Sequence, residues 1–346
     1  MFYESSIFKN EEVLSFEYLP EFLPHREEQI KIIAKNIEPA AFKRKPQNTF
    51  LYGGPGIGKT ATVKFIFREF QENYPNVKTI YMNCWDYNTS IAVLAKICED
   101  LEIYVQRRGW GKDEIMKRLL EFLNKSDKGY VLALDEVDQL IFKDDKALYD
   151  LLRINQYIKN PFGIIFISNN KHAFVNVEPR IKSSLNIEEI EFKPYTFQEM
   201  KDILMERAKL AFYSLENAAI LLAANHAIKK GSDVRVGLEI LMKAGRLAES
   251  ERENKLKVEH VKTILKEVNE VKPKILEEKI NEHEKKIIEI LKKESLGIKE
   301  LYKKYAELTE NPLSEKMFRN YLKHLESINL IKKLKRKKLI ILNKNV

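Results

Sequence analysis

The chain has 346 residues, of which 44% are hydrophobic and 32% charged, and its formal net charge is +9. No run approaches the ~18 apolar residues of a membrane span, and the start, Met1-Phe2-Tyr3-Glu4, lacks the basic-then-apolar layout of a signal peptide. Cys84 and Cys98 are spaced neither as a disulfide framework nor as a zinc site. These features exclude a membrane protein and favour a globular protein of the reducing cytoplasm, with two or three domains.

The net charge is concentrated near the C-terminus. Residues 271–346 contain 20 lysines and arginines against 11 glutamates and no aspartate, which accounts for the whole excess of +9. This asymmetry predicts a polyanionic partner for the C-terminal segment. The alternative is a solvated lysine-rich surface.

The first strong motif is Gly53-Gly54-Pro55-Gly56-Ile57-Gly58-Lys59-Thr60, which fits the phosphate-binding loop pattern. Residues 48–52 predict a buried strand before it, and residues 61–70 predict a helix after it. The backbone N–H groups of such a loop surround phosphate oxygens. Lys59 is then expected to reach the outer phosphates, and the Thr60 hydroxyl to bind Mg²⁺. The cofactors predicted here are ATP or ADP with Mg²⁺, and the predicted cofactor contacts in the loop are Gly56, Ile57, Gly58, Lys59 and Thr60.

Strands and helices alternate around this loop. Helices are predicted at 26–37, 90–101 and 113–124, and further strands at 77–83, 130–136, 163–168 and 187–192. Pro179-Arg180 is expected in a loop. The alternation predicts an α/β domain with a mostly parallel sheet and helices on both faces.

Polar residues follow two of the buried strands. Asp135 and Glu136 end the apolar run 130–134, and Asn169 ends the strand 163–168. Ligands of open α/β sheets bind at the carboxyl ends of the strands. Asp135 therefore suits Mg²⁺, Glu136 suits a base that polarises the attacking water, and the Asn169 amide suits the γ-phosphate or the water. An Asp-Glu pair after a strand can also be a helix cap, and Asn169 an ordinary turn residue.

The remainder of the chain reads as two further domains. Residues 196–269 are helical throughout, and Gly231-Ser232-Asp233 predicts a helix start with Arg235 in the first turn. Val271-Lys272-Pro273 predicts a linker. The predicted domains are an ATP-binding base at 1–195, a helical lid at 196–270, and the linker with a nucleic-acid-binding domain at 271–346.

The C-terminal domain is predicted as a winged helix-turn-helix. Residues 282–346 give three helices and two strands, and Ser314 can cap the third helix, whose apolar side carries Phe318, Tyr321, Leu322 and Leu325. Its opposite side presents cations and an amide, which suit phosphates and base edges. A basic hairpin tip follows. The predicted DNA contacts are Lys316, Arg319, Asn320, Lys323, Lys335, Arg336 and Lys337. Winged helices also serve as protein-binding modules, so protein binding stays open as an alternative for this domain.

The chain as a whole resembles the archaeal replication initiators related to the origin recognition complex and to cell division control protein six. The resemblance covers residues from about 14 to the C-terminus. It rests on stretches whose order and spacing are specific together: Tyr18-Leu19-Pro20-Glu21, Pro24-His25-Arg26-Glu27, Tyr52 to Thr60, Leu134-Asp135-Glu136-Val137-Asp138, Ile167-Ser168-Asn169, Glu178 to Leu185, Phe192-Lys193-Pro194-Tyr195-Thr196 and Gly231-Ser232-Asp233-Val234-Arg235. It implies an AAA+ P-loop ATPase with a parallel sheet, a helical lid domain and a C-terminal winged helix-turn-helix.

The resemblance also implies roles for single residues. Asn169 and Arg235 would sense the γ-phosphate, and Arg180 would be an arginine finger acting on a neighbouring subunit's ATP. Tyr195 and Arg207 would lie near the nucleotide. With Lys59 and Glu136, the residues Asn169, Arg180 and Arg235 form the predicted catalytic set.

A loop at 107–112 matches the initiator-specific insertion, which contacts and deforms DNA. Its predicted DNA contacts are Arg107, Arg108, Trp110 and Lys112, and Trp110 is either a stacking group or packed on its own domain. Two positions depart from the family pattern: the wing tip, Lys335-Arg336-Lys337-Lys338, has no glycine, and Ile57 stands where threonine is common.

The predicted function is that of an ATP-dependent replication initiator, which binds double-stranded origin DNA and helps recruit the replicative helicase, alone or beside paralogous initiators. Its ATPase is expected to be slow and to act as a switch. The alternative is a regulatory AAA-type ATPase whose winged helix binds a protein partner.

Overall fold

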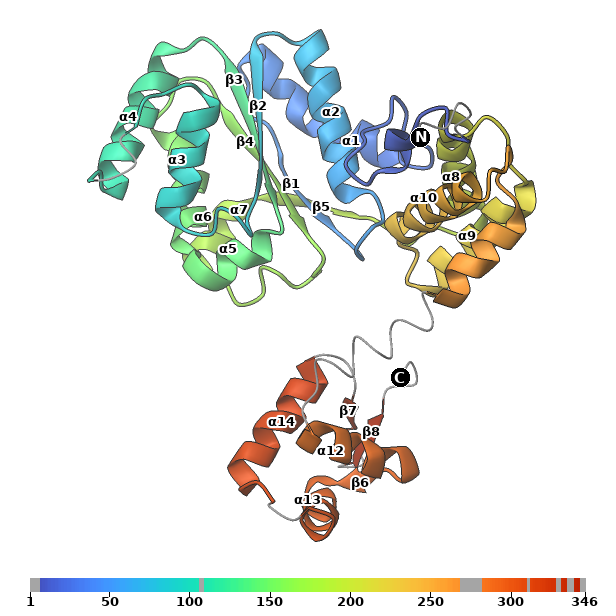
Figure 1. Ribbon diagram of the computed structural model, residues 1–346. Coiled ribbons are helices and arrows are strands. Elements are labelled where there is room, and N and C mark those ends of the chain that lie inside the picture. The colour runs from blue at the N-terminus through green and yellow to red at the C-terminus, as the bar shows by residue number, and fades with distance from the viewer. Residues whose placement is uncertain are drawn as a thin grey trace. The chain divides into compact units, whose positions relative to one another are not determined.

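The computed structural model describes residues 7–105, 109–267, 282–309, 312–327, 331–334 and 339–342. The chain forms two compact units, Met1–Lys262 and Thr263–Val346, and Figure 1 shows the elements of each. None of the described helices is both long enough and apolar enough to cross a bilayer.

The first unit is built on a five-stranded parallel sheet in the order β2-β3-β4-β1-β5. Its strands are β1 (Asn48–Tyr52), β2 (Val77–Asn83), β3 (Gly129–Asp135), β4 (Phe162–Ser168) and β5 (Ile187–Glu191). All five strands were predicted. Every residue of β1, β3 and β4 is buried, because helices cover both faces of the sheet at these inner strands.

Helices pack on both faces of this sheet. On one face lie α1 (Glu27–Ile37) and α2 (Lys59–Asn73), and Figure 1 shows them to one side of the strands. The other face buries one apolar cluster under five helices: α3 (Ser90–Asp100), α4 (Lys112–Lys125), α5 (Val137–Asp144), α6 (Lys146–Arg153) and α7 (Pro179–Leu185). Short 3₁₀ turns lie at Glu38–Phe42 and Ile154–Gln156. The predicted α/β architecture is therefore confirmed.

Three helices on this second face were missed or misplaced. No helix was assigned to α5 or α6, which have only eight residues each. The expectation that Pro179-Arg180 lies in a loop is wrong, because α7 begins at Pro179. Proline lacks an N–H, but the first turn of a helix leaves that group unbonded in any case.

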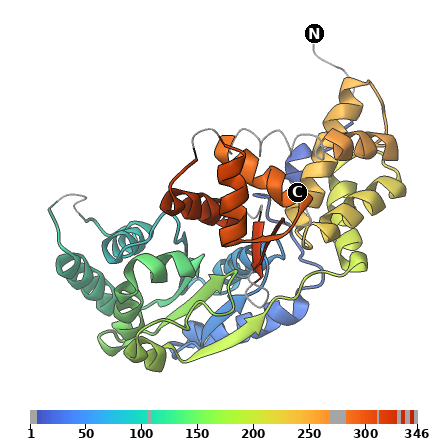
Figure 2. The same cartoon turned by 90° about the horizontal axis from the view of Figure 1, so that it is seen from below.

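The rest of the first unit is a helical lid. It contains α8 (Phe197–Ala211), α9 (Asn217–Lys229), α10 (Val234–Ser250) and helical residues 258–262. Both views show α8, α9 and α10 gathered to one side of the sheet (Figures 1 and 2). The N-terminal part packs on the lid: Phe8 stacks on Phe212 with ring centres 5.0 Å apart, and Lys9 N–H donates to Ala211 O at 2.7 Å. The next residues, Glu11–Leu14, form a 3₁₀ turn that packs against α8 and α10.

The second unit has the order of a winged helix-turn-helix. Its elements are α12 (Glu282–Lys293), β6 (Leu296–Gly297), α13 (Ile298–Glu307), α14 (Glu315–Ser327), β7 (Ile331–Leu334) and β8 (Leu339–Leu342). The strands form an antiparallel sheet in the order β6-β8-β7. Strand β6 was not predicted, because two residues are too few to show a period of alternation.

Candidate nucleotide-binding site and nucleic-acid interface

The phosphate-loop sequence forms a tight turn between β1 and α2. Gly56 and Gly58 have positive φ angles of 67° and 93°, a backbone conformation that residues other than glycine rarely adopt. Space requires glycine there as well: a Cβ on Gly56 would lie 1.8 Å from the Asp233 carboxylate, and one on Gly58 would lie 2.8 Å from the Tyr195 hydroxyl. The loop is thus closely covered by Tyr195, which precedes the lid, and by Asp233, which caps the lid helix α10.

Lys59 is buried at the floor of this turn. Its Nζ donates to Gly53 O at 2.9 Å, to Gly54 O at 2.7 Å and to Asn169 Oδ1 at 2.8 Å. Burial lowers the pKa of Lys59, and the charges of Asp135 and Glu136 oppose that shift. The ammonium group is therefore held next to Asn169 at the position where an anionic oxygen would be stabilised.

Thr60 and Asp135 meet at the carboxyl edge of the sheet. Thr60 Oγ1 donates to Asp135 Oδ2 at 2.6 Å, and the Tyr81 hydroxyl donates to the same oxygen at 2.8 Å. A hydroxyl beside a carboxylate suits Mg²⁺, which completes its shell with water and substrate phosphates. The described residues contain no group of three or more histidine, cysteine or acidic ligands, so phosphate or water oxygens would have to supply the remaining ligands.

Tyr81 was missed by sequence reasoning. It lies on β2, whose register beside β3 brings this strand's carboxyl end next to Asp135. Burial, followed by the charge of Asp135, raises the Tyr81 pKa, so its hydroxyl remains a donor. Its position two residues before the end of a predicted strand is the signal that could have identified it.

Glu136 has an unusual backbone conformation. Its φ angle is +53°, in the left-handed region, at the N-cap of α5. Asn169 Nδ2 donates to both carboxylate oxygens, at 3.0 and 3.1 Å. Burial, with a further contribution from the Asp135 charge, raises the pKa of Glu136. A carboxylate with a raised pKa is a better proton acceptor, which suits the role predicted for it.

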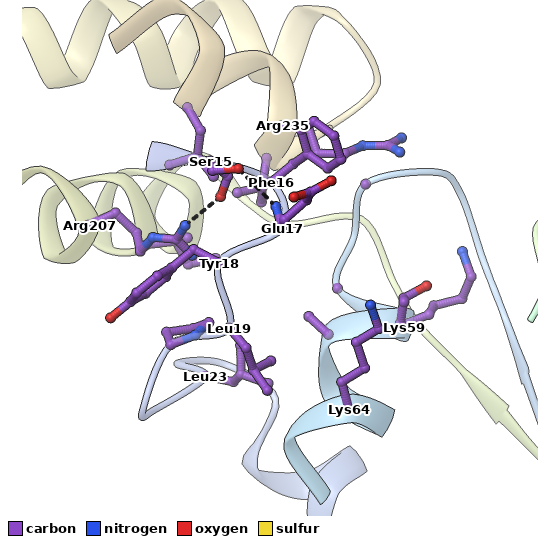
Figure 3. Close-up of a pocket in the computed structure, with 18 of the residues that line it drawn as sticks. Ser15, Phe16, Glu17, Tyr18, Leu19, Leu23, Lys59, Lys64, Arg207 and Arg235 are labelled. Atoms are coloured by element: carbon purple, nitrogen blue, oxygen red, sulfur yellow. Dashed lines mark hydrogen bonds between the residues drawn. The ribbon is translucent and has the colours of Figure 1, made fainter. Parts of the chain in front are cut away.

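These residues line one cavity of about 490 Å³. Lys59, Thr60, Asp135, Glu136 and Asn169 lie along it. The cavity wall also includes most of residues 15–24, which we call the strap. Figure 3 shows the strap running between Arg207 on one side and Lys59 on the other. The strap was read as irregular sequence, so its place at the site was not predicted.

Two buried residues predicted to lie near the nucleotide also line the cavity. Arg207 turns its guanidinium to the N-terminal segment: Nε donates to Val13 O at 2.6 Å. Nη2 donates to Ser15 O at 2.9 Å, as Figure 3 shows. Burial lowers the Arg207 pKa to about 10. Tyr195 is also buried. Arg207 thus fastens the strap to the lid as well as lining the cavity.

The two remaining predicted arginines have different surroundings. Arg235 lies at the start of α10, lines the cavity and is bonded to Asp233 through Nε at 3.0 Å and Nη2 at 2.7 Å. That hydrogen bond raises the Arg235 pKa. Arg180 lies in the first turn of α7, where 70% of its side chain is exposed and its Nε is 2.9 Å from Glu178. Arg180 is not among the residues that line the described cavity.

In the second unit, α14 separates apolar from polar residues. Phe318, Leu322 and Leu325 are buried in its core, and Arg319, Asn320 and Lys323 are exposed. Lys316 lies on the same helix. Ser314 Oγ accepts from Met317 N–H at 3.4 Å, as expected for a cap. The predicted contacts Lys335, Arg336 and Lys337 lie outside the described residues.

The insertion between β2 and β3 is only partly described. Arg107 and Arg108 lie outside the described residues. Trp110 packs against the apolar cluster of the sheet, 5.8 Å from the Arg118 guanidinium. Lys112 Nζ forms an ion pair with Asp150 at 3.0 Å. Both side chains therefore have partners within their own domain.

Comparisons with known proteins identify related families. Residues 43–173 match the model of an AAA domain, and residues 201–264 match that of a Cdc6 AAA+ ATPase-type lid domain. The chain is 40% identical over 271 residues to an ORC1-type DNA replication protein 1 of Archaeoglobus fulgidus, covering 76% of this chain and 66% of that one. It is 40% identical over 268 residues to an ORC1-type DNA replication protein of Pyrococcus abyssi, with coverage of 74% and 64%. These matches thus span just under two thirds of each relative's length.

Among solved structures, the chain is similar to the ORC1 protein of Aeropyrum pernix in complex with DNA. The TM-score is 0.77 and the identity 30%, over 98% of this chain and 94% of that one. The ORC2 protein of Aeropyrum pernix, solved as ADPNP and ADP complexes, shares the fold at 23% identity, with a TM-score of 0.70 and coverage of 97% and 94%.

Proposed function

The chain belongs to the family of archaeal ORC1/Cdc6-type DNA replication proteins, and from this premise we propose that it is an ATP-dependent replication initiator that binds duplex origin DNA. The observation that supports this best is the convergence of Lys59, Asp135, Glu136 and Asn169 on one cavity. Nucleotide binding there would be an event separate from binding by α14, because the excess of positive charge lies in residues 271–346, which belong to a second compact unit.

The residues around the cavity have complementary roles in this proposal. Lys59 and the N–H groups of the loop bind the phosphates of ATP or ADP, and Thr60 with Asp135 holds Mg²⁺, which would neutralise the charge that develops on the transferred phosphoryl group. Glu136 accepts a proton from the attacking water, and the products are ADP and phosphate. Turnover is slow in this proposal, so that the bound nucleotide acts as a switch. Asn169, which donates to both Glu136 oxygens, holds the carboxylate in place and leaves lone pairs free for the water.

The arginines connect the nucleotide to conformation and assembly. Arg235 would report the γ-phosphate to the lid, and Tyr195 and Arg207 would contact the nucleotide at the cavity wall. Arg180, exposed and paired with the neighbouring Glu178, is suited to act on the ATP of another copy or a paralogue. If it does, the turnover per molecule rises with protein concentration in the wild type and stays constant in Arg180→Ala.

For DNA, we propose that α14 enters the major groove and that its exposed face contacts bases and phosphates. The insertion around Trp110 and the wing would add backbone contacts, and the DNA-bound protein would help to load the replicative helicase. We propose the domain division 1–195, 196–270 and 271–346 for these tasks. The cytoplasmic location stays a prediction.

The experiment that tests the proposal is footprinting on intergenic DNA of the source replicon, with ATP and with ADP, for the wild type and Lys59→Ala. We expect a discrete footprint for both proteins, with nucleotide dependence only in the wild type. Calorimetry should show ATP binding that Lys59→Ala loses. The absence of any footprint, combined with ATP turnover that a protein partner stimulates, would refute the proposal and favour a regulatory ATPase.

A further inference from the structure

We propose that Arg26 is a positioning residue for phosphate binding: it holds the Ile57–Gly58 peptide from behind the loop and joins it to the segment that leads into the lid. Arg26 lies outside the phosphate-loop motif, 31 residues before Ile57. The inference rests on the proposed nucleotide-binding function and assigns to that site a residue that does not itself touch the ligand.

The Arg26 side chain is almost completely enclosed, with a relative exposure of 4%. Its guanidinium donates twice to Ile57 O, from Nε at 3.1 Å and from Nη2 at 2.8 Å. Nη2 also donates to Lys193 O at 3.1 Å, and Nη1 donates to His25 O at 3.1 Å. All of these bonds go to backbone carbonyls, so the planar fork fixes backbone groups of three separate segments at once.

The doubly bonded carbonyl determines the direction of one loop N–H. The Ile57–Gly58 peptide is trans, since none of the described peptide bonds is cis. In a trans peptide, the C=O and the following N–H point to opposite sides. Because Arg26 holds Ile57 O on its own side, Gly58 N–H points to the other side. Gly58 lines the cavity, whereas neither Ile57 nor Arg26 does.

The same guanidinium contacts the connection between β5 and α8. It lies 3.9 Å from the centre of the Tyr195 ring and 5.3 Å from that of Phe192. The Tyr195 hydroxyl in turn occupies the space where a side chain on Gly58 would lie. Arg26 therefore joins the phosphate loop to the residues that directly precede the lid helix α8, so a change in their position would be transmitted to the Gly58 N–H.

The test uses the full chain with Arg26→Met and Arg26→Lys, and Arg246→Met as a matched control. Arg246 is an exposed arginine of α10 that pairs with Glu11 and does not line the cavity. Displacement of a fluorescent ADP analogue measures the affinities of ADP, pyrophosphate and adenosine. We expect Arg26→Met to weaken ADP and pyrophosphate by about ten- to a hundredfold, the range for a lost charged hydrogen-bond network, with adenosine unchanged.

Arg26→Lys separates geometry from charge. Lysine keeps the positive charge but lacks the fork that bridges Ile57 O and Lys193 O, so we expect it to bind pyrophosphate nearly as weakly as Arg26→Met. Arg246→Met should match the wild type. If Arg26→Met is poorly folded, Arg26→Ala supplemented with a few millimolar guanidinium ion should regain pyrophosphate affinity.

Three results would overturn the inference. They are wild-type pyrophosphate affinity in Arg26→Met, full recovery in Arg26→Lys, and an equal loss of adenosine and pyrophosphate binding, which would mean general collapse of the pocket. Failure of the wild-type chain to bind any nucleotide would instead refute the proposed function, and the inference with it.

Discussion

The nucleotide cavity and the outer face of α14 differ in how their functional side chains are held. Around the cavity, Lys59 and Asp135 are buried and bonded to other site residues. On α14, Arg319 and Lys323 are exposed, and Arg319 pairs with Glu315 at 3.4 Å on the helix surface. Buried groups recognise a small ligand by fixed geometry, whereas exposed cations recognise a polyanion mainly by charge and lose affinity in salt. The two sites should therefore respond to different kinds of substitution.

The largest expected effect is on ATP hydrolysis, in a variant that leaves nucleotide binding and DNA binding unchanged. Glu136→Gln should lower ATP turnover by about 10²- to 10⁴-fold, the usual contribution of a general base. Lys59, Thr60 and Asp135 are untouched, so ATP affinity should stay near that of the wild type. Single-turnover hydrolysis at saturating ATP measures the rate, and anisotropy with labelled duplex should show no change. Hydrolysis within about twofold of the wild type would assign the base elsewhere.

Substitution of one loop glycine tests whether geometry decides nucleotide affinity. Gly56→Ala introduces a Cβ that would lie 1.8 Å from the Asp233 carboxylate, at a φ of +67°. The strain of that backbone region is about 1–2 kcal/mol, so ADP should bind about five- to thirtyfold more weakly. Gly54→Ala is the matched control, because a Cβ there would meet nothing within 4 Å. Equal ADP affinities for the two variants, by calorimetry, would contradict the close fit of loop and lid.

The complementary test removes charge from α14. Arg319→Ala with Lys323→Ala should weaken duplex binding about tenfold at moderate salt and make the plot of log affinity against log salt shallower by about two. Nucleotide affinity should not change. The control, Lys285→Ala with Lys292→Ala, removes the same charge from exposed positions of α12. If both double variants lose equal affinity, DNA binding depends on the net charge of the unit and not on the exposed face of α14.

The smallest expected effect is on stability. The pKa of Glu136 is raised in the folded state, so the native protein binds more protons there than the unfolded chain, and stability falls as pH rises through that interval. At pH 7 the ionised Glu136 therefore destabilises the fold. We expect Glu136→Gln to raise the Tm of nucleotide-free protein by about 1–3 °C.

The gain in Tm should shrink as pH approaches the ordinary glutamate value of about 4.3. Scanning calorimetry across this range measures it, with Glu189→Gln on the exposed side of β5 as the control. A lower Tm for Glu136→Gln at pH 7 would show that Asn169 stabilises the charge by more than burial destabilises it.

Sequence reasoning found the parts of the site that depend on local pattern. The loop glycines, the carboxylates after β3 and the amide after β4 follow from a motif and from the ends of apolar runs. It did not find the strap, Tyr81 or the role of Arg26. These depend on contacts between residues far apart in the chain: Arg26 reaches Lys193 across 167 positions, and Arg207 reaches Val13 across 194. Local periodicity contains no information about such pairs.

The strap also imposes an order on the maturation of the protein. Its residues leave the ribosome before any other part of the cavity, yet Arg207, which holds Ser15, is synthesised 192 residues later. At ~5–20 residues per second, the N-terminal segment waits for roughly 10–40 s without its partner. During translation the sheet can form while the cavity still lacks one wall. The wall that Arg207 anchors can therefore close only after α8 has emerged, which makes completion of the cavity depend on synthesis of the lid.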